Sequence, residues 1–379
     1  MPETPILFIV AGEPSGDRLG ADLVRRLRTK TAVTPIGVGG PELIGEGLQS
    51  IFPMRDVSVM GTTDVLMRLP LLLWRLRQTV DAIIARKPDV VLLVDSQVFS
   101  QTVATRLRKR GYQGKVLLLV APSVWAWKPE RAAAIRPLYD EVLAVFPFEP
   151  AVMKSLGGPR TTYVGHPALE QSSARHTQPE AGPLLLLPGS RRGELNRHLP
   201  LMRTAAQSLL GHRRITGFVL PTVRDEAARV TRVVSGWPVP VRVVVRPDEK
   251  HEAFAEAVAA VAVTGTVTLE LALAGVPMVT TYVADRSQVA AAEKYKLRYA
   301  ALPNILASDL VVPEFTGGQV DPLAVAAAMR RLLDEGTAVD AQRAAFSRIR
   351  TAMEQGQADA PLTDATDRLL SYFRLLKGT

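Results

Sequence analysis

Short apolar runs alternate with amphipathic helical patterns along the whole chain of 379 residues. The runs in the first half are rich in Val, Ile and Leu, which is typical of strands buried on both faces of a sheet. They lie at Ile6–Ala11, Thr34–Val38, Val90–Asp95, Lys115–Val120, Val142–Phe146 and Thr162–Val164. Helical patterns such as Asp17–Arg28 and Ser100–Arg110 separate them, and this alternation predicts parallel βαβ units.

A second series of the same kind follows His166–Pro183, a segment without periodicity that we interpret as a linker. Its strands are expected at Leu184–Leu187, Phe218–Leu220, Val241–Val245, Ala260–Val263 and Met278–Tyr282, and Pro322–Leu376 is mostly helical in pattern. We therefore predict an α/β protein with two doubly wound domains and a cleft between them. Ligands of such sheets bind outside the carboxyl ends of the strands, so motifs at strand-to-helix turns are the candidates for function.

Composition narrows the class of partner and excludes several chemistries. The net charge of +9 indicates an acidic partner, such as nucleic acid, anionic lipid or a phosphorylated substrate, although a solvated basic surface would give the same value. The absence of cysteine excludes disulfides, thiolate metal sites and cysteine nucleophiles. No stretch reaches the roughly 18 uncharged apolar residues needed to span a bilayer. We expect a protein that is soluble or lies on a membrane surface.

The first candidate motif, Ala11-Gly12-Glu13-Pro14-Ser15-Gly16-Asp17, stands between the first strand and the first helix. Its glycines allow the backbone to approach a ligand closely. Ser15 or Asp17 can cap the helix, whose N-terminus favours negative charge. The motif is not a dinucleotide fingerprint, because G-x-G-x-x-G is absent. A tight turn with a helix cap is the structural alternative.

The second motif, Leu187–Glu194, reads L-P-G-S-R-R-G-E and follows the first strand of the second domain. A Gly-Ser turn at a helix N-terminus suits a pyrophosphate, because backbone N–H groups and the helix dipole receive its oxygen atoms. A guanidinium can fork onto the same oxygens. Ser190 and Arg191 are therefore expected to bind phosphate; a solvated basic turn is the alternative.

The third motif lies in Thr264–Pro277, where a strand ends and a helix begins near Thr266. The first helical turn offers hydroxyls and free N–H groups, which again favours a phosphate site. Glu270 lies one turn further along an otherwise apolar helix, where a lone carboxylate is costly without hydrogen-bond partners. The two adjacent hydroxyls of a ribose would supply them. An arginine from a neighbouring element is the alternative partner.

Other chemistries find no support in the sequence. No Asp-x-Asp pair occurs, and the five histidines lack metal-ligand spacing, so we expect neither a metal nor a cofactor. The P-loop and the G-x-S-x-G elbow are both absent, which argues against an NTPase and an α/β-hydrolase. No aromatic-plus-basic stacking motif supports nucleic-acid binding.

A membrane contact is predicted at Leu66–Leu76, which is apolar on most sides and carries arginines and one tryptophan. That composition is typical of an interfacial helix on anionic lipid. The expected contact residues are Leu69, Leu72, Leu73 and Trp74. A helix packed into the core or into a dimer interface is the alternative.

Together these motifs resemble the lipid-A-disaccharide synthase family over nearly the whole chain. The match also includes Val38–Pro41, Met60-Gly61, Pro122–Trp127, Val164–Pro167 and Leu302–Asn304. The resemblance implies a GT-B fold whose last helix returns to the first domain, no metal, and UDP held by the C-terminal domain. It implies transfer of 2,3-diacylglucosamine from UDP onto 2,3-diacylglucosamine 1-phosphate, giving a β-1′,6 disaccharide.

The resemblance also implies a domain plan and residue roles. Residues 1–167 face the acceptor and the membrane, 168–345 bind the UDP-sugar, and 346–379 pack back toward the first domain. The expected UDP-sugar ligands are Ser190, Arg191, Gly265, Thr266, Thr268, Glu270, Asn304 and Glu314. The expected acceptor-side residues are Ser15, Asp17, Ser123 and Trp125. Such an enzyme is expected in the cytoplasm, at the periphery of the inner membrane, with an acylated sugar phosphate as acceptor; a homodimer stays open.

The chain departs from the family pattern at the candidate base. The family usually carries Asp-x-Pro-Asp-Phe, whereas this chain reads Asp95-Ser96-Gln97-Val98-Phe99. An inverting displacement needs a base near the acceptor hydroxyl, commonly worth ~10²–10⁴-fold in rate. Asp95 is therefore the leading candidate, Glu13 the second and Asp17 a third. The departure keeps two alternatives open: a related UDP-sugar transferase or epimerase with another acceptor, and a non-catalytic UDP-sugar or lipid-binding protein.

Overall fold

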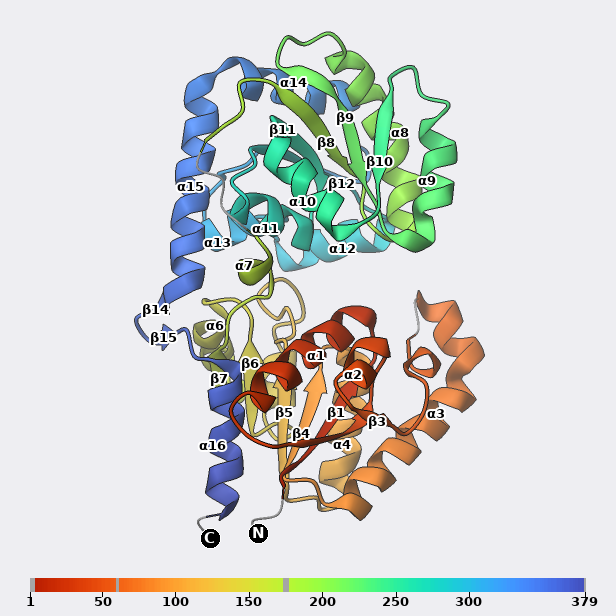
Figure 1. Ribbon diagram of the computed structural model, residues 1–379, viewed down its shortest axis with the longest axis vertical. Coiled ribbons are helices and arrows are strands. Elements are labelled where there is room, and N and C mark those ends of the chain that lie inside the picture. The colour runs from red at the N-terminus through yellow and green to blue at the C-terminus, as the bar shows by residue number, and fades with distance from the viewer. Residues whose placement is uncertain (1–3, 59–60, 173–176, 378–379) are drawn as a thin grey trace. The chain divides into compact units, whose positions relative to one another are not determined.

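The computed structural model describes residues 4–58, 61–172 and 177–377, which form two compact α/β units (Figure 1). Unit 1 contains Met1–His166 and Gln355–Thr379, and unit 2 contains Pro167–Glu354. The chain rejoins unit 1 at Gln355 rather than near residue 346, because helix α15 runs without a break from Gly336 to Gln355. Within the described residues, no helix has both the length and the apolarity needed to cross a membrane.

Unit 1 is built on a parallel seven-stranded sheet of order β3-β2-β1-β4-β5-β6-β7. Its strands are β1 (Ile6–Ala11), β2 (Thr34–Val38), β3 (Gln49–Ser50), β4 (Val90–Val94), β5 (Lys115–Leu119), β6 (Glu141–Ala144) and β7 (Thr161–Tyr163). Its helices are α1 (Pro14–Arg28), α2 (Pro41–Gly45), α3 (Gly61–Arg86), α4 (Gln97–Lys109), α5 (Arg131–Ile135), α6 (Glu149–Ser155) and α16 (Ala365–Lys377), with a 3-10 turn at Met54–Asp56.

The alternation of side chains along β1 explains the two layers of helices on this sheet. Phe8 and Val10 face the core formed with α3 and α4, whereas Leu7 and Ile9 face the core formed with α1 and α16. The strands are buried on both faces, as their continuous apolar runs predict. The last helix therefore completes the second face of unit 1, which confirms the predicted return of the C-terminus to the first domain.

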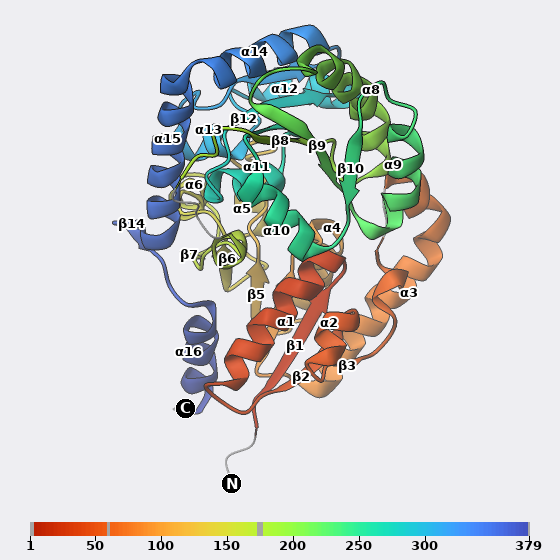
Figure 2. The ribbon, with the colours of Figure 1, turned by 45° about the horizontal axis from the view of Figure 1, so that its top comes forward.

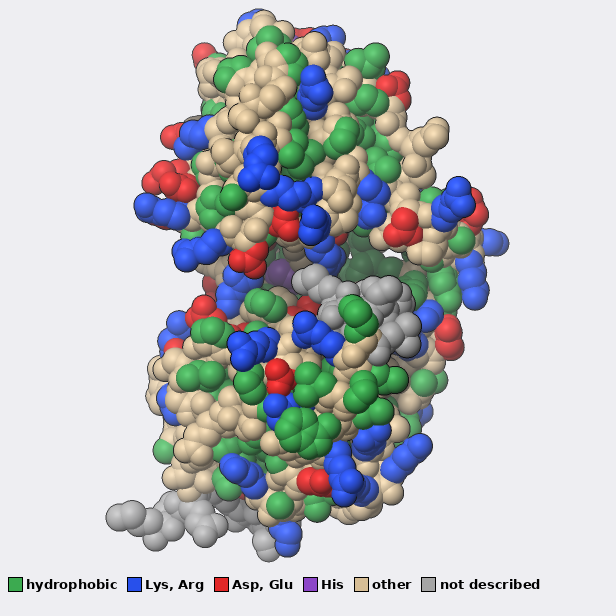
Figure 3. Space-filling view, turned by 90° about the vertical axis from the view of Figure 1, so that its right-hand side faces the viewer, with side chains coloured by type: hydrophobic (Ala, Val, Ile, Leu, Met, Phe, Trp, Pro, Cys, Tyr) green, Lys and Arg blue, Asp and Glu red, His purple; other side chains and the backbone are tan. Residues whose placement is uncertain are grey.

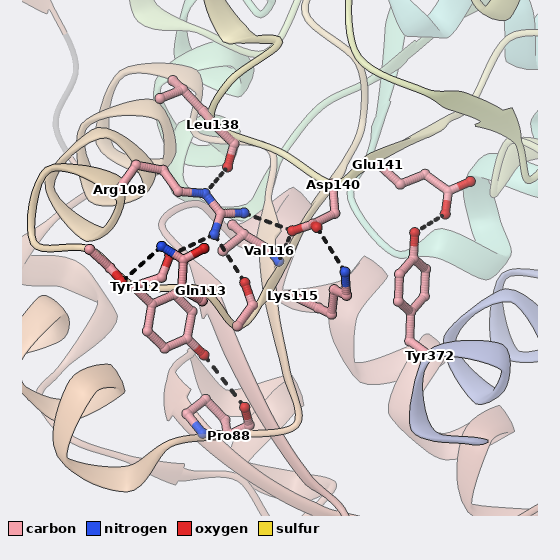
Figure 4. A network of polar contacts seen from close by, with 12 residues as sticks. Pro88, Arg108, Tyr112, Gln113, Lys115, Val116, Leu138, Asp140, Glu141 and Tyr372 are labelled. Carbon is pink, nitrogen blue, oxygen red and sulfur yellow. Dashed lines mark hydrogen bonds and ion pairs between the residues drawn. The ribbon is translucent and has the colours of Figure 1, made fainter. Parts of the chain in front are cut away.

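A buried carboxylate fixes α16 to the sheet. Glu141, at the start of β6, is fully buried, and Arg368 Nε donates to its two oxygens at 2.9 and 2.8 Å. The Tyr372 hydroxyl donates to the same carboxylate at 2.8 Å (Figure 4). The neighbouring Asp140 binds the side chains of Arg108 and Lys115, so the amino end of β6 carries two adjacent ion-pair networks.

Unit 2 is built on a parallel six-stranded sheet of order β10-β9-β8-β11-β12-β13. Its strands are β8 (Gly182–Leu187), β9 (Ile215–Pro221), β10 (Val241–Val244), β11 (Ala259–Val263), β12 (Met278–Val283) and β13 (Glu314–Gly317). Its helices are α7 (Ala168–Gln171), α8 (Arg192–Leu209), α9 (Ala227–Val234), α10 (Pro247–Glu256), α11 (Thr266–Leu273), α12 (Arg286–Tyr295), α13 (Leu302–Ala307), α14 (Pro322–Asp334) and α15, with a 3-10 turn at Arg224–Glu226.

Helices cover both faces of the unit 2 sheet. One core joins the sheet to α8, α9 and α14, while α10 and α11 lie against the other face (Figure 2). A short antiparallel hairpin, β14 (Gly356–Gln357) with β15 (Ala360–Pro361), belongs to unit 1 and precedes α16. The prediction of two doubly wound α/β domains is confirmed.

Candidate functional site

The carboxyl ends of β1 and β4 form the topological switch point of unit 1. The chain passes from β1 to β2 on one side and comes back to β4 on the other, and Ala11 pairs with Val94. A Cβ on Gly12 would lie 2.6 Å from the Ser96 hydroxyl, so the turn after β1 touches the turn after β4. The predicted Gly-Glu-Pro-Ser-Gly-Asp motif and Asp95 thus share the crevice in which open α/β sheets bind ligands.

Left-handed backbone marks the same edge of the sheet. Asp95, Ser96 and Val120 have φ values of 47°, 43° and 76°. This conformation is uncommon without glycine, and it is an outlier for a β-branched residue such as Val120. Each such residue costs on the order of 1–3 kcal/mol, and strain of this kind clusters at functional sites. The Asp95 N–H donates to the Leu119 carbonyl at 2.9 Å, which fixes this half-buried residue at the end of β4.

The three polar residues of the turn after β1 have different environments. Glu13 is half-buried at the N-cap of α1 without making a side-chain capping bond, and Ser15 is exposed. Asp17 is 1% exposed, and its carboxylate accepts backbone N–H groups of Gly40 (2.7 Å), Glu42 (3.0 Å) and Leu43 (3.2 Å). Asp17 therefore joins α1 to the start of α2, and its expected acceptor-side role stays a prediction.

Ser123 and Trp125 lie in the loop after β5. The Ser123 carbonyl accepts the N–H groups of Ala126 (3.0 Å) and Trp127 (3.2 Å), which closes a turn at the loop. The indole Nε1 of Trp125 donates at 3.2 Å to Glu149, a buried carboxylate that lies outside the sequence motifs. Burial raises the pKa of Glu149 to about 7. Its signal in the sequence is the acidic residue of Phe148-Glu149-Pro150, a charge at a helix start among apolar residues.

The switch point of unit 2 lies between β8 and β11, which pair with each other. Two helices begin there, α8 after β8 and α11 after β11, so two helix N-termini meet at one edge of the sheet. Such an edge presents backbone N–H groups and positive helix-dipole ends to an anion. The second and third motifs of the sequence are thereby brought together.

Arg191 and Ser190 are exposed at the start of α8, as a phosphate site requires. Their backbone N–H groups donate to Glu194 at 3.3 and 3.2 Å, and the Arg191 guanidinium contacts the same carboxylate at 3.2 Å. Gly189, with φ of 98°, leaves the space for it, since a Cβ there would lie 2.5 Å from Glu194 Oε2. Glu194 therefore orders this turn, and the arginine keeps 67% of its side chain exposed.

At the start of α11, Gly265 and Thr266 are exposed, and Gly265 has φ of 147°. Thr268 is fully buried, and its hydroxyl donates to the Gly265 carbonyl at 2.7 Å. The contact of Thr268 with the UDP-sugar stays a prediction; in the structure its hydroxyl stabilises the turn. Glu270 is half-buried and forms an ion pair with Lys250 of α10, so its basic partner is a lysine rather than an arginine.

Asn304 and Glu314 are joined by hydrogen bonds that hold α13 to β13. Asn304 is fully buried, its amide donates to the Val312 carbonyl and to Glu314, and its oxygen accepts two backbone N–H groups at 2.8 Å. Glu314 also accepts the N–H groups of Ala300 and Ala301. The expected contact of this pair with the nucleotide sugar stays a prediction, and the half-buried Glu314 is the more accessible of the two.

A buried histidine fixes α8 against β12. His198 accepts the Val283 N–H at Nε2 (2.9 Å), and its Nδ1 lies 2.8 Å from the Glu194 carbonyl. Burial lowers the pKa of His198, which keeps the ring neutral, with its proton on Nδ1. Within the described residues, no group of three or more His, Asp or Glu side chains is placed to hold a metal ion.

The comparisons with known proteins agree with this geometry. A family model described as lipid-A-disaccharide synthetase matches residues 7–363. The chain belongs to the lipid-A-disaccharide synthase family. It is 39% identical over 383 residues to a lipid-A-disaccharide synthase from Nitrobacter hamburgensis, a match that covers 98% of this chain and 96% of that one.

Solved structures show the fold beyond the lipid-A-disaccharide synthase family. The calicheamicin glycosyltransferase CalG4 superposes with a TM-score of 0.59 at 17% identity, covering 99% of this chain and 100% of that one. The UDP-GlcNAc 2-epimerase from Neisseria meningitidis, solved with UDP-GlcNAc, gives 0.59 at 12% identity, covering 92% and 99%. The predicted GT-B fold and the assignment to a glycosyltransferase family are confirmed.

The predicted membrane segment of this family member lies on α3. Leu69, Leu73 and Trp74 are 42%, 45% and 56% exposed, and the α3 face of unit 1 shows hydrophobic side chains bordered by lysine and arginine (Figure 3). Leu72 is the exception, because it packs against the core below the helix. Arg75 lies over the Trp74 ring at 4.0 Å and binds Asp56, so the indole is held by a fixed cation.

Proposed function

We propose that this chain transfers 2,3-diacylglucosamine from its UDP derivative to 2,3-diacylglucosamine 1-phosphate, releasing UDP and forming the β-1′,6 disaccharide 1-phosphate. The observation that carries the proposal is the edge of unit 2 where α8 and α11 begin side by side, with Arg191 and the Lys250–Glu270 pair next to these helix starts. This arrangement suits a diphosphate joined to a ribose. Membership of the family supplies the sugar and the acceptor.

Each part of the UDP-sugar donor has a proposed partner of complementary charge or hydrogen-bonding capacity in unit 2. The diphosphate receives N–H groups at Gly265 and Thr266 and the guanidinium of Arg191. Glu270 accepts the ribose hydroxyls, and Lys250 neutralises and orients that carboxylate. As the bond between the anomeric carbon and the diphosphate breaks, negative charge grows on UDP. Preorganised donors stabilise such charge without having to reorganise during the reaction.

The acceptor half assigns the proton transfer to Asp95. The acceptor hydroxyl attacks the anomeric carbon from the face opposite UDP, its proton passes to the Asp95 carboxylate, and the bonding electrons leave with UDP. The configuration at the anomeric carbon is thereby inverted. The fixed backbone of Asp95 at the switch point of unit 1 supports this role, because a general base must be held within hydrogen-bond reach of its proton. Glu13, on the adjacent turn, is the second candidate.

The exposed face of α3 is proposed to contact an anionic membrane surface at the periphery of the inner membrane. Its arginines attract acidic headgroups, and its leucines and Trp74 enter the boundary of the acyl chains. Both proposed substrates carry acyl chains, so a surface of this kind would bring the enzyme to the layer where the substrates reside.

The test is an assay of the purified protein with both acylated sugars, together with UDP binding by calorimetry. Asp95→Asn is expected to lower turnover by about 10²–10⁴-fold without changing the affinity for UDP. Glu270→Ala is expected to weaken UDP binding by roughly 10–100-fold, as the loss of hydrogen bonds to a charged group implies. Full turnover by Asp95→Asn would remove this residue from the mechanism.

The same assay separates the alternatives. UDP release that requires the acylated glucosamine phosphate excludes an epimerase. Conversion of the UDP-sugar without an acceptor would favour the epimerase instead, and the UDP-GlcNAc 2-epimerases share this fold. Binding of UDP without turnover of any acylated sugar pair would identify a non-catalytic binding protein.

A further inference from the structure

A cluster of rings lies at the carboxyl ends of β5, β6 and β7 in unit 1. Phe146 stacks on Phe148, with 5.8 Å between ring centroids, and on His166, with 5.4 Å. Trp125 lies edge-on to Phe148 at 5.5 Å and an interplanar angle of 84°. Three segments that are distant in the sequence therefore pack into one apolar support at the same edge of the sheet as Asp95.

Glu149 lies within this cluster and is 2% exposed. Its Oε2 accepts the backbone N–H groups of Val145 (3.1 Å) and Phe146 (3.0 Å), and its Oε1 accepts the indole N–H of Trp125 (3.2 Å). Burial of a carboxylate among rings is costly unless its hydrogen bonds compensate. The three N–H donors offset part of this cost, and the one from Trp125 belongs to another loop.

That bond fixes residues 120–128, a loop that starts and ends at residues with left-handed backbone. Val120 has φ of 76° and Lys128 has φ of 51°. The loop begins beside the candidate base, because the Asp95 N–H donates to the Leu119 carbonyl and Leu119 directly precedes Val120. The indole of Trp125 links this loop to the first residue of α6.

From these contacts we infer that Glu149 is a positioning residue of the transferase: its carboxylate holds the Trp125 indole and so sets the 120–128 loop beside Asp95 for the acceptor sugar. The inference rests on the proposed function for the identity of the acceptor. Glu149 is 2% exposed, so we expect it to act through Trp125 rather than by touching the substrate. The hydrogen bond between Glu149 and the Trp125 indole can be tested without assuming which reaction the enzyme catalyses.

The contact between Glu149 and the Trp125 indole is expected to depend on pH. Burial raises the pKa of Glu149 to about 7. Burial and the Glu149 charge raise the pKa of Tyr163 on β7, and burial lowers the pKa of His166 to about 4. Both neighbours therefore stay neutral between about pH 5 and 8, where Glu149 titrates. The proton enters at Oε1, since Oε2 already receives two N–H groups, and the new O–H competes with the Trp125 indole.

The test follows the indole N–H signals of the four tryptophans by ¹⁵N–¹H NMR from about pH 5.5 to 8.5, a range set by the window in which Glu149 titrates. One signal is expected to move with a midpoint near 7, to vanish in Trp125→Phe and to stay constant with pH in Glu149→Gln. Trp127→Phe, in the same loop, removes a different signal and leaves the titrating one. A Trp125 signal that does not change with pH overturns the proposed contact.

A second, kinetic experiment measures kcat/KM for the acceptor, normalised to the concentration of folded enzyme. Glu149→Gln is expected to lower it about 10-fold or more, because small misplacements at a reacting centre carry costs of this size. UDP affinity should stay unchanged, and the limb of the pH profile near 7 should disappear. Asp140→Asn is the matched control: it removes another unit 1 carboxylate, at the amino end of β6, and should leave the acceptor kcat/KM unchanged.

The outcomes separate the inference from the function on which it rests. A wild-type protein that binds UDP without turning over the acylated sugars refutes the proposed reaction. The Trp125 indole signal is still expected to shift when 2,3-diacylglucosamine 1-phosphate is added, and the absence of that shift overturns the positioning role. Unchanged acceptor kcat/KM in Glu149→Gln, with wild-type turnover intact, overturns it as well.

Discussion

Replacement of Glu141 by glutamine is predicted to loosen the last helix from unit 1. The carboxylate is fully buried and contacts Arg368, Tyr372, Thr162 and, at 3.4 Å, Arg160. Glutamine keeps one oxygen for the Tyr372 hydroxyl but removes the charge that faces the guanidinium. Loss of one partner of a buried ion pair costs about 3–5 kcal/mol, mostly because the other charge stays buried and unpaired.

The structure places the expected cost at the lower end of that range. Arg368 keeps 18% of its side chain exposed, donates to Ser371 at 3.2 Å, and lies 5.2 Å from the centre of the Tyr372 ring. These partners offset part of the loss, so we expect about 3 kcal/mol. For a domain of about 150–250 residues, that loss lowers the melting temperature by roughly 6–12 °C.

The assay is thermal and urea unfolding, with hydrogen exchange of the amides in α16 as the local readout. Lys30→Met is the matched control, because Lys30 pairs with Asp367 of the same helix on the exposed surface. Exposed pairs contribute about 0–1 kcal/mol. If Glu141→Gln costs no more than Lys30→Met, the buried carboxylate does not hold the helix. In that case the apolar contacts of Leu369 and Phe373 would account for its docking.

Two further predictions concern pH and lipid. Burial raises the pKa of Glu149 from 4.5 to about 7, so its contribution to stability is fully present below pH 4.5 and is lost as the pH rises through 7; the loss amounts to about 3 kcal/mol in urea unfolding. Glu149→Gln should lack this slope, and an equal slope in the variant would contradict the assignment. Leu73→Glu with Trp74→Glu should abolish co-sedimentation with anionic vesicles, whereas Leu72→Ala, at a partly buried position packed against the core, should mainly lower stability. Vesicle binding that survives the double substitution excludes α3 as the anchor.

Hydrophobic patterning predicts most strands of both sheets, and the deviations have local causes. β4 and β5 each end one residue earlier than predicted, because Asp95 and Val120 adopt left-handed backbone. The edge strand β13 is not predicted by the pattern, because it is only four residues long and three of them are polar or glycine. The hairpin of β14 and β15 interrupts the helical tail at Gly356, whose φ is 78°.

In the third motif, the position of a residue around helix α11 indicates its role better than membership of the motif does. Thr266 and Glu270 are four residues apart and share one side of α11, whereas Thr268 lies on the other side, in the core. Helical spacing alone therefore separates the two roles. Partners from other elements are different, because Lys250 of α10 lies beside Glu270 only through the packing of the sheet. The periodicity of the sequence does not predict that contact.

Val98 stands where the family pattern has its second carboxylate, and its position predicts how a carboxylate there would behave. This side chain is 81% exposed in the first turn of α4. A carboxylate there would be solvated and stabilised in its charged form by the positive end of the helix dipole. Its pKa would stay low, and a general base works best with a pKa near the operating pH. Asp95, half-buried at the switch point, lacks that exposure. We therefore expect Val98→Asp to leave turnover nearly unchanged and Asp95→Asn to lower it by about 10²–10⁴-fold.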